Sequence, residues 1–260
     1  MQINNQMLVI TSGKPNDMPS VDNDTLKAAI KKLQYAQLYD DCQFTKITAE
    51  HHLTLDILEI LGVHDMQMIH FLRQSTDKEI NLDSWNIALM SANTCYIARE
   101  YIQDNQKIYC LNVFAGYCAQ RNQYQNNCFL NNAAICAKTL LLTPEVSVDN
   151  VGILDFVQSQ ADVFDYELIH VEQIIAFSNI TKSEYLNLID TAINNLLAKN
   201  IDVLIIPFGV INVKFDDYFD IGELISRKCV DIKIIITQEE CNVDDISTVV
   251  YSFLTGINAN

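Results

Sequence analysis

Thiol and imidazole groups are the most reactive side chains in this sequence, which carries eight cysteines and five histidines. The cysteines are Cys42, Cys95, Cys110, Cys118, Cys128, Cys136, Cys229 and Cys241. None of them forms a C-x-x-C pair, and no zinc-ribbon spacing occurs. Cys95, Cys110 and Cys136 lie inside apolar periodic stretches, where a thiol is usually a small buried hydrophobic group. We therefore expect reduced thiols and no metal site built from cysteine pairs.

The motifs of common catalytic sites are missing from the sequence. There is no G-x-S-x-G nucleophile turn, no Walker loop and no G-x-G-x-x-G, and seven glycines leave little material for a phosphate-binding loop. One acidic cluster, formed by Asp216, Asp217 and Asp220, could in principle bind a cation. A solvated surface loop is the more economical prediction for it.

The charge of the chain restricts its partners. The 33 acidic residues outnumber the 17 basic ones, and the formal net charge is −16. Nucleic acid and anionic membranes would repel such a protein, whereas a basic protein or peptide would not. The N-terminus lacks the pattern of a signal peptide, and no stretch approaches the length of a membrane span. We expect an acidic cytoplasmic protein, and the Asn- and Ile-rich composition suggests a bacterial source.

The elements that would position any site alternate along the chain. Short apolar stretches typical of buried parallel strands lie at 7–10, 107–114, 150–156, 166–171, 202–208 and 231–237. Helical periodicity occurs over 25–38, 85–102 and 182–199. No Pro-, Gly- or Ser-rich linker divides the sequence. These patterns predict a single α/β domain over residues 1–260, with a mainly parallel sheet between helices.

Two neighbouring segments carry a resemblance to a known family. Gly116-Tyr117-Cys118-Ala119 is followed, after a loop, by residues 126–135, NNCFLNNAAI. This pair of segments resembles the G-H-H-A and G-F-C-x-x-N-N-x-A-I motifs of the histone deacetylase and acetylpolyamine amidohydrolase family. Four further segments agree in order, at residues 63–72, 153–155, 202–209 and 233–242. The resemblance implies the arginase/deacetylase fold, a three-layer domain with about eight mainly parallel strands.

The same resemblance indicates which catalytic groups this chain has replaced. The family's histidine pair falls on Tyr117 and Cys118, and its three zinc ligands fall on Val157, Ser159 and Ile211. The tyrosine that stabilises the oxyanion falls on Cys241, and Glu239 and Glu240 stand where the family has paired glycines. Valine and isoleucine offer a metal no donor atom. The resemblance therefore implies a catalytically inactive member, a pseudoenzyme, with no metal and no cofactor.

We call the set of residues that would surround the former zinc position the relic pocket. It consists of Asn131, Asn132, Asp155, Val157, Ser159, His170, Glu172 and Ile211. Replacing charged ligands by aliphatic side chains predicts an apolar, largely filled pocket. Structural roles are expected for its polar members: helix capping for the two asparagines and backbone hydrogen bonding for Asp155.

Three functions remain open at this point. The leading hypothesis is a non-catalytic deacetylase-like protein that acts by binding an unknown protein partner or by forming a homo-oligomer. The alternative is a hydrolase with a remodelled, non-zinc or thiol-containing site built from Tyr117, Cys118, His170, Glu172 and Cys241. A third possibility is a small-molecule sensor that uses the relic pocket.

Overall fold

Seven parallel strands form one sheet in the computed structural model, in the order β2-β1-β3-β7-β6-β4-β5. The structure describes residues 7–11, 44–50, 52–75, 82–111, 116–117, 119–124, 128–156, 162–175, 180–208, 215–239 and 246–259. The strands are β1 (Met7–Thr11), β2 (Phe44–Thr48), β3 (Lys107–Leu111), β4 (Val151–Asp155), β5 (Ile169–Gln173), β6 (Val203–Phe208) and β7 (Lys233–Gln238). The parallel sheet between helices confirms the predicted fold class. Seven strands lie in the described part of the chain, against the eight or so expected.

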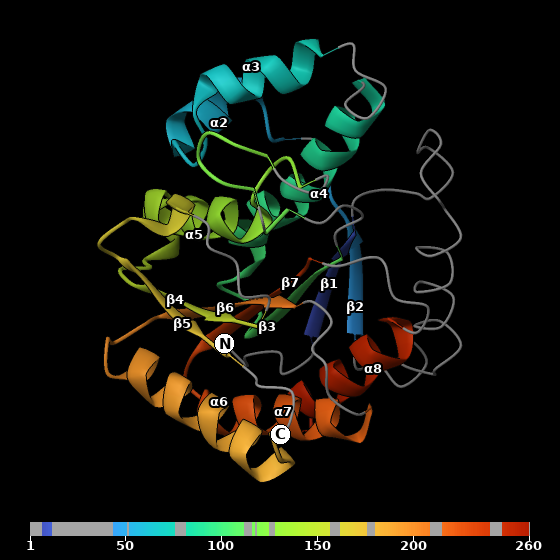
Figure 1. The fold of residues 1–260 in the computed structure, drawn as a ribbon, viewed down its shortest axis with the longest axis vertical. Coiled ribbons are helices and arrows are strands. Elements are labelled where there is room, and N and C mark those ends of the chain that lie inside the picture. The colour runs from blue at the N-terminus through green and yellow to red at the C-terminus, as the bar shows by residue number, and fades with distance from the viewer. Residues whose placement is uncertain are drawn as a thin grey trace.

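Two helical layers cover the sheet, as Figure 1 shows. One layer holds α6 (Lys182–Leu197), α7 (Phe215–Lys228) and α8 (Ile246–Ile257). The other holds α4 (Leu82–Tyr101) and α5 (Asn132–Leu142), and beyond these lie α2 (Leu55–Leu61) and α3 (Met66–Gln74). Short 3-10 turns occupy Pro144–Val146 and Asp162–Phe164. The molecule is therefore a three-layer α/β structure with an additional helical pair on one side.

The central strands are apolar on both faces because both faces are covered. All six residues of β6 are buried. Val203 and Ile205 pack in the core next to α4 and α5, whereas Leu204, Ile206 and Phe208 pack in the core next to α6, α7 and α8. Alternate side chains of a strand point to opposite faces, so both sides of β6 must be hydrophobic.

All six strands predicted from the sequence are present, and the helices predicted over 85–102 and 182–199 correspond to α4 and α6. The helix predicted over 25–38 lies outside the described residues. Strand β2 was not predicted. It pairs with β1 at one edge of the described sheet, and its sequence, FTKIT, alternates polar and apolar residues over only five positions.

The loop predicted for the acidic cluster is wrong, because Asp216, Asp217 and Asp220 lie in helix α7. The helix buries Tyr218 and Ile221 among the residues that face the sheet. Asp217 and Asp220 pair with Lys182 at the start of α6, with the Lys182 Nζ 3.3 Å from an Asp217 oxygen. Apolar residues at helical spacing therefore favour a helix in this segment, and Asp217 and Asp220 are directed towards α6.

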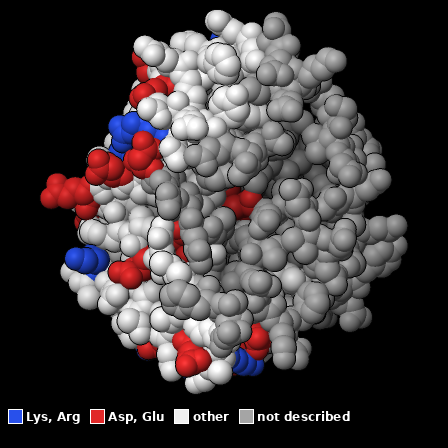
Figure 2. Space-filling model, in the orientation of Figure 1, with Lys and Arg blue, Asp and Glu red and all other residues white. Residues whose placement is uncertain are grey.

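Acidic side chains outnumber lysines and arginines on the left and lower part of the view in Figure 2. A further acidic group is visible near the middle of this view. No helix among the described residues is both long and apolar enough to span a membrane.

Candidate functional site at the carboxyl ends of the strands

The centre of the candidate site is Glu239, the residue that follows β7. Its side chain extends the row of Ile235 and Thr237, which faces α5. The Oε2 atom accepts hydrogen bonds from the backbone N–H groups of Gly116 at 2.9 Å and Tyr117 at 3.0 Å. It also accepts one from Asn132 Nδ2 at 3.2 Å, while the Thr237 hydroxyl donates to Oε1 at 2.7 Å. One carboxylate thus joins the ends of β3 and β7 to the start of α5.

Burial dominates the electrostatics of Glu239. Only 3% of the residue is exposed, and loss of hydration raises the pKa of its carboxyl group to about 7. The four donors oppose this shift because hydrogen bonds to a carboxylate favour its charged form. Desolvation is the larger effect, so this carboxyl group changes charge close to neutral pH.

Gly116 allows the close approach on which this arrangement depends. A Cβ atom at this position would lie 1.8 Å from the Leu130 carbonyl oxygen and 2.9 Å from Asn132 Nδ2. No side chain fits at such distances. The glycine therefore lets the backbone after β3 pass directly against the start of α5.

Tyr117 and Asp155 form the second part of the site. Asp155 ends β4 and is fully buried, in the row of Val151 and Ile153 that faces α4 and α5. Tyr117 is 1% exposed. Burial, followed by interaction with the Asp155 carboxyl group, raises the pKa of the Tyr117 phenol well above its usual range. The phenol therefore stays protonated at neutral pH and faces Asp155.

Asn131 and His64 hold the other end of the segment that contains Tyr117. Asn131 caps α5 by accepting the Ala134 N–H through its side-chain oxygen at 2.9 Å, and its Nδ2 donates to the carbonyl groups of Tyr117 and Ala119. This confirms the predicted capping role of Asn131. The Asn131 backbone N–H donates in turn to His64 Nε2 at 2.9 Å.

The hydrogen bonds of His64 define its protonation state. Because Nε2 accepts a hydrogen bond, the ring proton lies on Nδ1, 2.7 Å from the Gln120 carbonyl oxygen. Burial lowers the pKa of His64 to about 4. The imidazole is therefore neutral and structural, linking residue 120 to the start of α5.

The structure separates two residues of the predicted site from the rest. His170 and Glu172 lie on β5, where His170 is opposite Gly152 of β4 and Gln173 is opposite Asp155. The His170 Nε2 is 3.3 Å from the Asn150 side-chain oxygen, before β4 begins. Glu172 accepts a hydrogen bond from Asn195 of α6, in the opposite helical layer. Neither residue joins Tyr117 in one site.

The remaining predicted site residues, Cys118, Val157, Ser159, Ile211 and Cys241, lie outside the described residues. Among the described members of the relic pocket, Asn131, Asn132 and Asp155 are buried, whereas His170 and Glu172 are partly exposed. The apolar, filled pocket stays a prediction, because the side chains expected to fill it lie outside the described residues. Glu239, which was not among the expected members, is buried next to Asn132.

The sequence indicated Glu239 only as a replacement for a family glycine and did not predict its role in the site. The signal that could have found it is its position at the end of the apolar stretch KIIITQ, where a charged side chain enters the buried carboxyl edge of a parallel sheet.

The free thiols of the described residues are all buried. They belong to Cys95, Cys110, Cys136 and Cys229, and burial contributes to raising the pKa of Cys110, Cys136 and Cys229. The expectation of reduced thiols is wrong for Cys128, which takes part in a disulfide bond.

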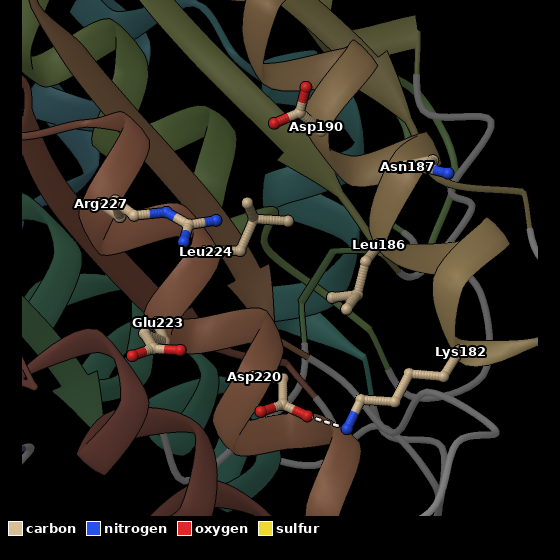
Figure 3. A pocket seen from close by; sticks show the side chains of 8 residues that line it. All are labelled: Lys182, Leu186, Asn187, Asp190, Asp220, Glu223, Leu224 and Arg227. Carbon is tan, nitrogen blue, oxygen red and sulfur yellow. Dashed lines mark ion pairs between the residues drawn. The ribbon is translucent and has the colours of Figure 1, made fainter.

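A separate groove of about 400 Å³ lies between α6 and α7 (Figure 3). It is lined by Lys182, Leu186, Asn187, Asp190, Asp220, Glu223, Leu224 and Arg227. Lys182 pairs with Asp220, and Lys228 pairs with Asp190 at 2.6 Å. The lining contains no thiol, imidazole or hydroxyl group. Three of its charged side chains, Lys182, Asp190 and Asp220, form ion pairs between the two helices.

Two solved structures have a fold similar to that of this chain. A crystal structure of acetylpolyamine aminohydrolase from Burkholderia pseudomallei superimposes with a TM-score of 0.73 at 17% identity, over 98% of this chain and 99% of that one. A crystal structure of the HDA15 HD domain gives a TM-score of 0.76 at 13% identity, over 99% of this chain and 89% of that one. The chain has the histone deacetylase-like fold. No protein-family model matches the sequence, and no curated protein matches it either.

The deacetylase-like fold raises the question of whether the residues present fit a zinc ion. By the resemblance of the sequence motifs, the ligand positions fall on Val157, Ser159 and Ile211, of which two are hydrocarbon side chains. Among the residues described here, no three His, Cys, Asp or Glu side chains lie together in a way that could hold a metal. The donor set that the resemblance implies would not fit zinc, and we derive no catalytic step through a metal.

Proposed function

We propose that this protein is a non-catalytic member of the deacetylase fold that acts by binding, either to a protein partner or to a second copy of itself. One observation carries the proposal. Glu239, at a position where the family resemblance places a glycine, directs its carboxylate to the N–H groups of Gly116 and Tyr117 and to Asn132. The carboxylate that contacts the backbone of the former base position thus bonds to the protein itself.

The chemistry of Tyr117 supports the same proposal. A general base must be unprotonated and have a pKa near the working pH. Tyr117 stands at a histidine position of the family motif, and its buried phenol has a pKa well above the usual value. Such a group donates a hydrogen bond at neutral pH and does not take a proton from water.

The test combines metal content with activity. The protein is purified from zinc-supplemented cells, analysed by plasma mass spectrometry, and assayed on acetyl-lysine peptides and acetylated polyamines. We expect far less than one zinc per chain and no hydrolysis. A variant with Val157→Asp, Ser159→His and Ile211→Asp is the matched control, since it should gain zinc if the fold is intact. Stoichiometric zinc in the unmodified protein, or hydrolysis abolished by a chelator, would overturn the proposal.

Self-association is measured independently by light scattering coupled to size-exclusion chromatography. A dimer or higher species that persists on dilution supports the homo-oligomer. A monomer at all concentrations would rule out the homo-oligomer, and the proposal would then require a separate protein partner.

A remodelled acid–base enzyme is the second candidate, and the pKa of Glu239 favours it. A buried carboxyl group with a pKa of about 7 beside a tyrosine is typical of catalytic acids and bases. Against it stands the 3% exposure of this residue, which leaves little room for a substrate to reach the carboxyl group. A metal-independent hydrolysis that Glu239→Gln abolishes while the fold persists would establish this candidate.

A further inference from the structure

We propose that Glu239 is a proton-operated latch: its ionised carboxylate holds Gly116, Tyr117 and the start of α5 against the end of β7, and its protonated form holds them less tightly. The inference goes beyond the proposed function, because it concerns how the carboxyl ends of the strands are joined, whether or not the site is catalytic.

The three hydrogen bonds to Glu239 Oε2 are strongest when the carboxyl group is ionised. Three N–H donors from two separate segments converge on the single atom Oε2, at 2.9, 3.0 and 3.2 Å. Hydrogen bonds to an ionised oxygen are shorter and roughly twice as strong as bonds to a neutral one. Protonation therefore weakens three contacts at once, and these contacts join β7 to the segment after β3 and to α5.

Protonation of Glu239 also changes its hydrogen bond with Thr237. Its hydroxyl donates to Oε1 in the structure, at 2.7 Å. Because Oε2 already faces three N–H groups, the proton must be added to Oε1. The carboxyl group then donates to the Thr237 oxygen, and the direction of that hydrogen bond is reversed.

The surroundings of Glu239 favour proton uptake. The titratable groups that face it are Cys110 and Tyr117 from the β3 side and Cys136 from α5, and Asp155 at the end of β4 faces the same tyrosine. These are thiol, phenol and carboxyl groups, so none of them supplies a positive charge. Burial raises the pKa of Glu239 to about 7, against the four hydrogen bonds that lower it. The latch would therefore operate in the neutral range.

The experiment follows the carboxyl group and its donors in the full-length protein by NMR. The Cδ signal of Glu239, labelled with carbon-13 and assigned with a Glu239→Gln variant, is recorded across the neutral range together with the amide signals of Gly116 and Tyr117. We expect all three to shift with one midpoint near 7. The Thr181 amide, which donates to the exposed Glu184 at 2.9 Å, is the internal control and should not move in this range.

Two variants make the test decisive. Glu239→Gln keeps an oxygen for the three N–H donors and an amide for Thr237, so it should fold and abolish the pH response of both amide signals. Thr237→Val removes the donor to Oε1 and should move the midpoint to higher pH. The proposal is overturned if Glu239 titrates near its ordinary value, if the two amides ignore its titration, or if Thr237→Val leaves the midpoint unchanged.

Discussion

His64 and Glu239 should make opposite contributions to the pH dependence of stability, and these contributions should nearly cancel in the unmodified protein. Burial lowers the pKa of His64 from 6.5 to about 4 and raises the pKa of Glu239 from 4.5 to about 7. As pH falls from 6.5 towards 4, the unfolded chain binds a proton at His64 that the folded chain rejects, so folding loses stability. Over the same range the folded chain retains a proton on Glu239 that the unfolded chain releases, so this contribution grows as pH falls.

The magnitude follows from the two shifts. One pKa unit corresponds to about 1.4 kcal/mol, and each group changes its contribution by about 2 kcal/mol between pH 4.5 and pH 6.5. Neither value needs a discount for solvent screening, because His64 is 4% exposed and Glu239 is 3% exposed. A change of about 2 kcal/mol corresponds to roughly 4–8 °C in Tm for a chain of this size.

Single variants should separate the contributions of His64 and Glu239 to the pH dependence of stability. In Glu239→Gln only the histidine remains, so the Tm should rise with pH relative to the unmodified protein. In His64→Gln, whose amide can donate to the Gln120 carbonyl and accept from the Asn131 N–H, the Tm should fall with pH relative to the unmodified protein. The double variant should again follow the unmodified protein. Circular dichroism melts or urea titrations at several pH values measure these differences.

The outcome that would refute this reasoning is specific. If Glu239→Gln and His64→Gln show the same slope of Tm against pH, the two groups do not have opposite shifts. The hydrogen-bond network assigned to them would then be wrong at one residue at least. A variant at exposed Glu184, whose pKa is lowered by its bonds to Thr181, controls for the loss of a surface carboxyl group.

Three further outcomes are expected. Gly116→Ala should prevent folding or destabilise the protein by more than about 4 kcal/mol, because the added Cβ would lie 1.8 Å from the Leu130 oxygen. A cooperative melt near that of the unmodified protein would contradict this. Asn131→Ala should cost about 3 kcal/mol in urea titrations, since it removes a helix cap and two bonds to buried carbonyl groups, and a loss below about 1 kcal/mol would count against the capping role. Iodoacetamide should leave four buried thiols unmodified in the native state, as read by mass spectrometry: Cys95, Cys110, Cys136 and Cys229. We also expect Cys118 and Cys241 to be unreactive in the same experiment. Fast labelling of either thiol would favour the thiol-containing site.

The apolar strands were predictable because burial on both faces leaves a local signature. Strands such as β6 and β7 are continuous hydrophobic stretches, and no alternative element fits five or six such residues between turns. The helix α7 was not predicted because clustered acids are also typical of a surface loop, although Tyr218, Ile221 and Ile225 follow helical spacing. Strand β2 gave a weak signal because a half-polar pentapeptide has no distinctive periodicity.

The sequence by itself determined the α/β class, six of the strands and the motif segments around Gly116 and Asn131, because these depend on local periodicity and residue identity. Only the tertiary structure decided which polar residues meet. Glu239 is separated from Gly116 by more than a hundred residues, and their contact exists because β7 pairs with β3 in the sheet. His170 appeared equally suitable in the sequence, yet its position on β5 gives it Asn150 as its partner instead. Hydrogen bonding, burial and pKa depend on such long-range neighbours, so residue types alone could suggest a site but could not assemble it.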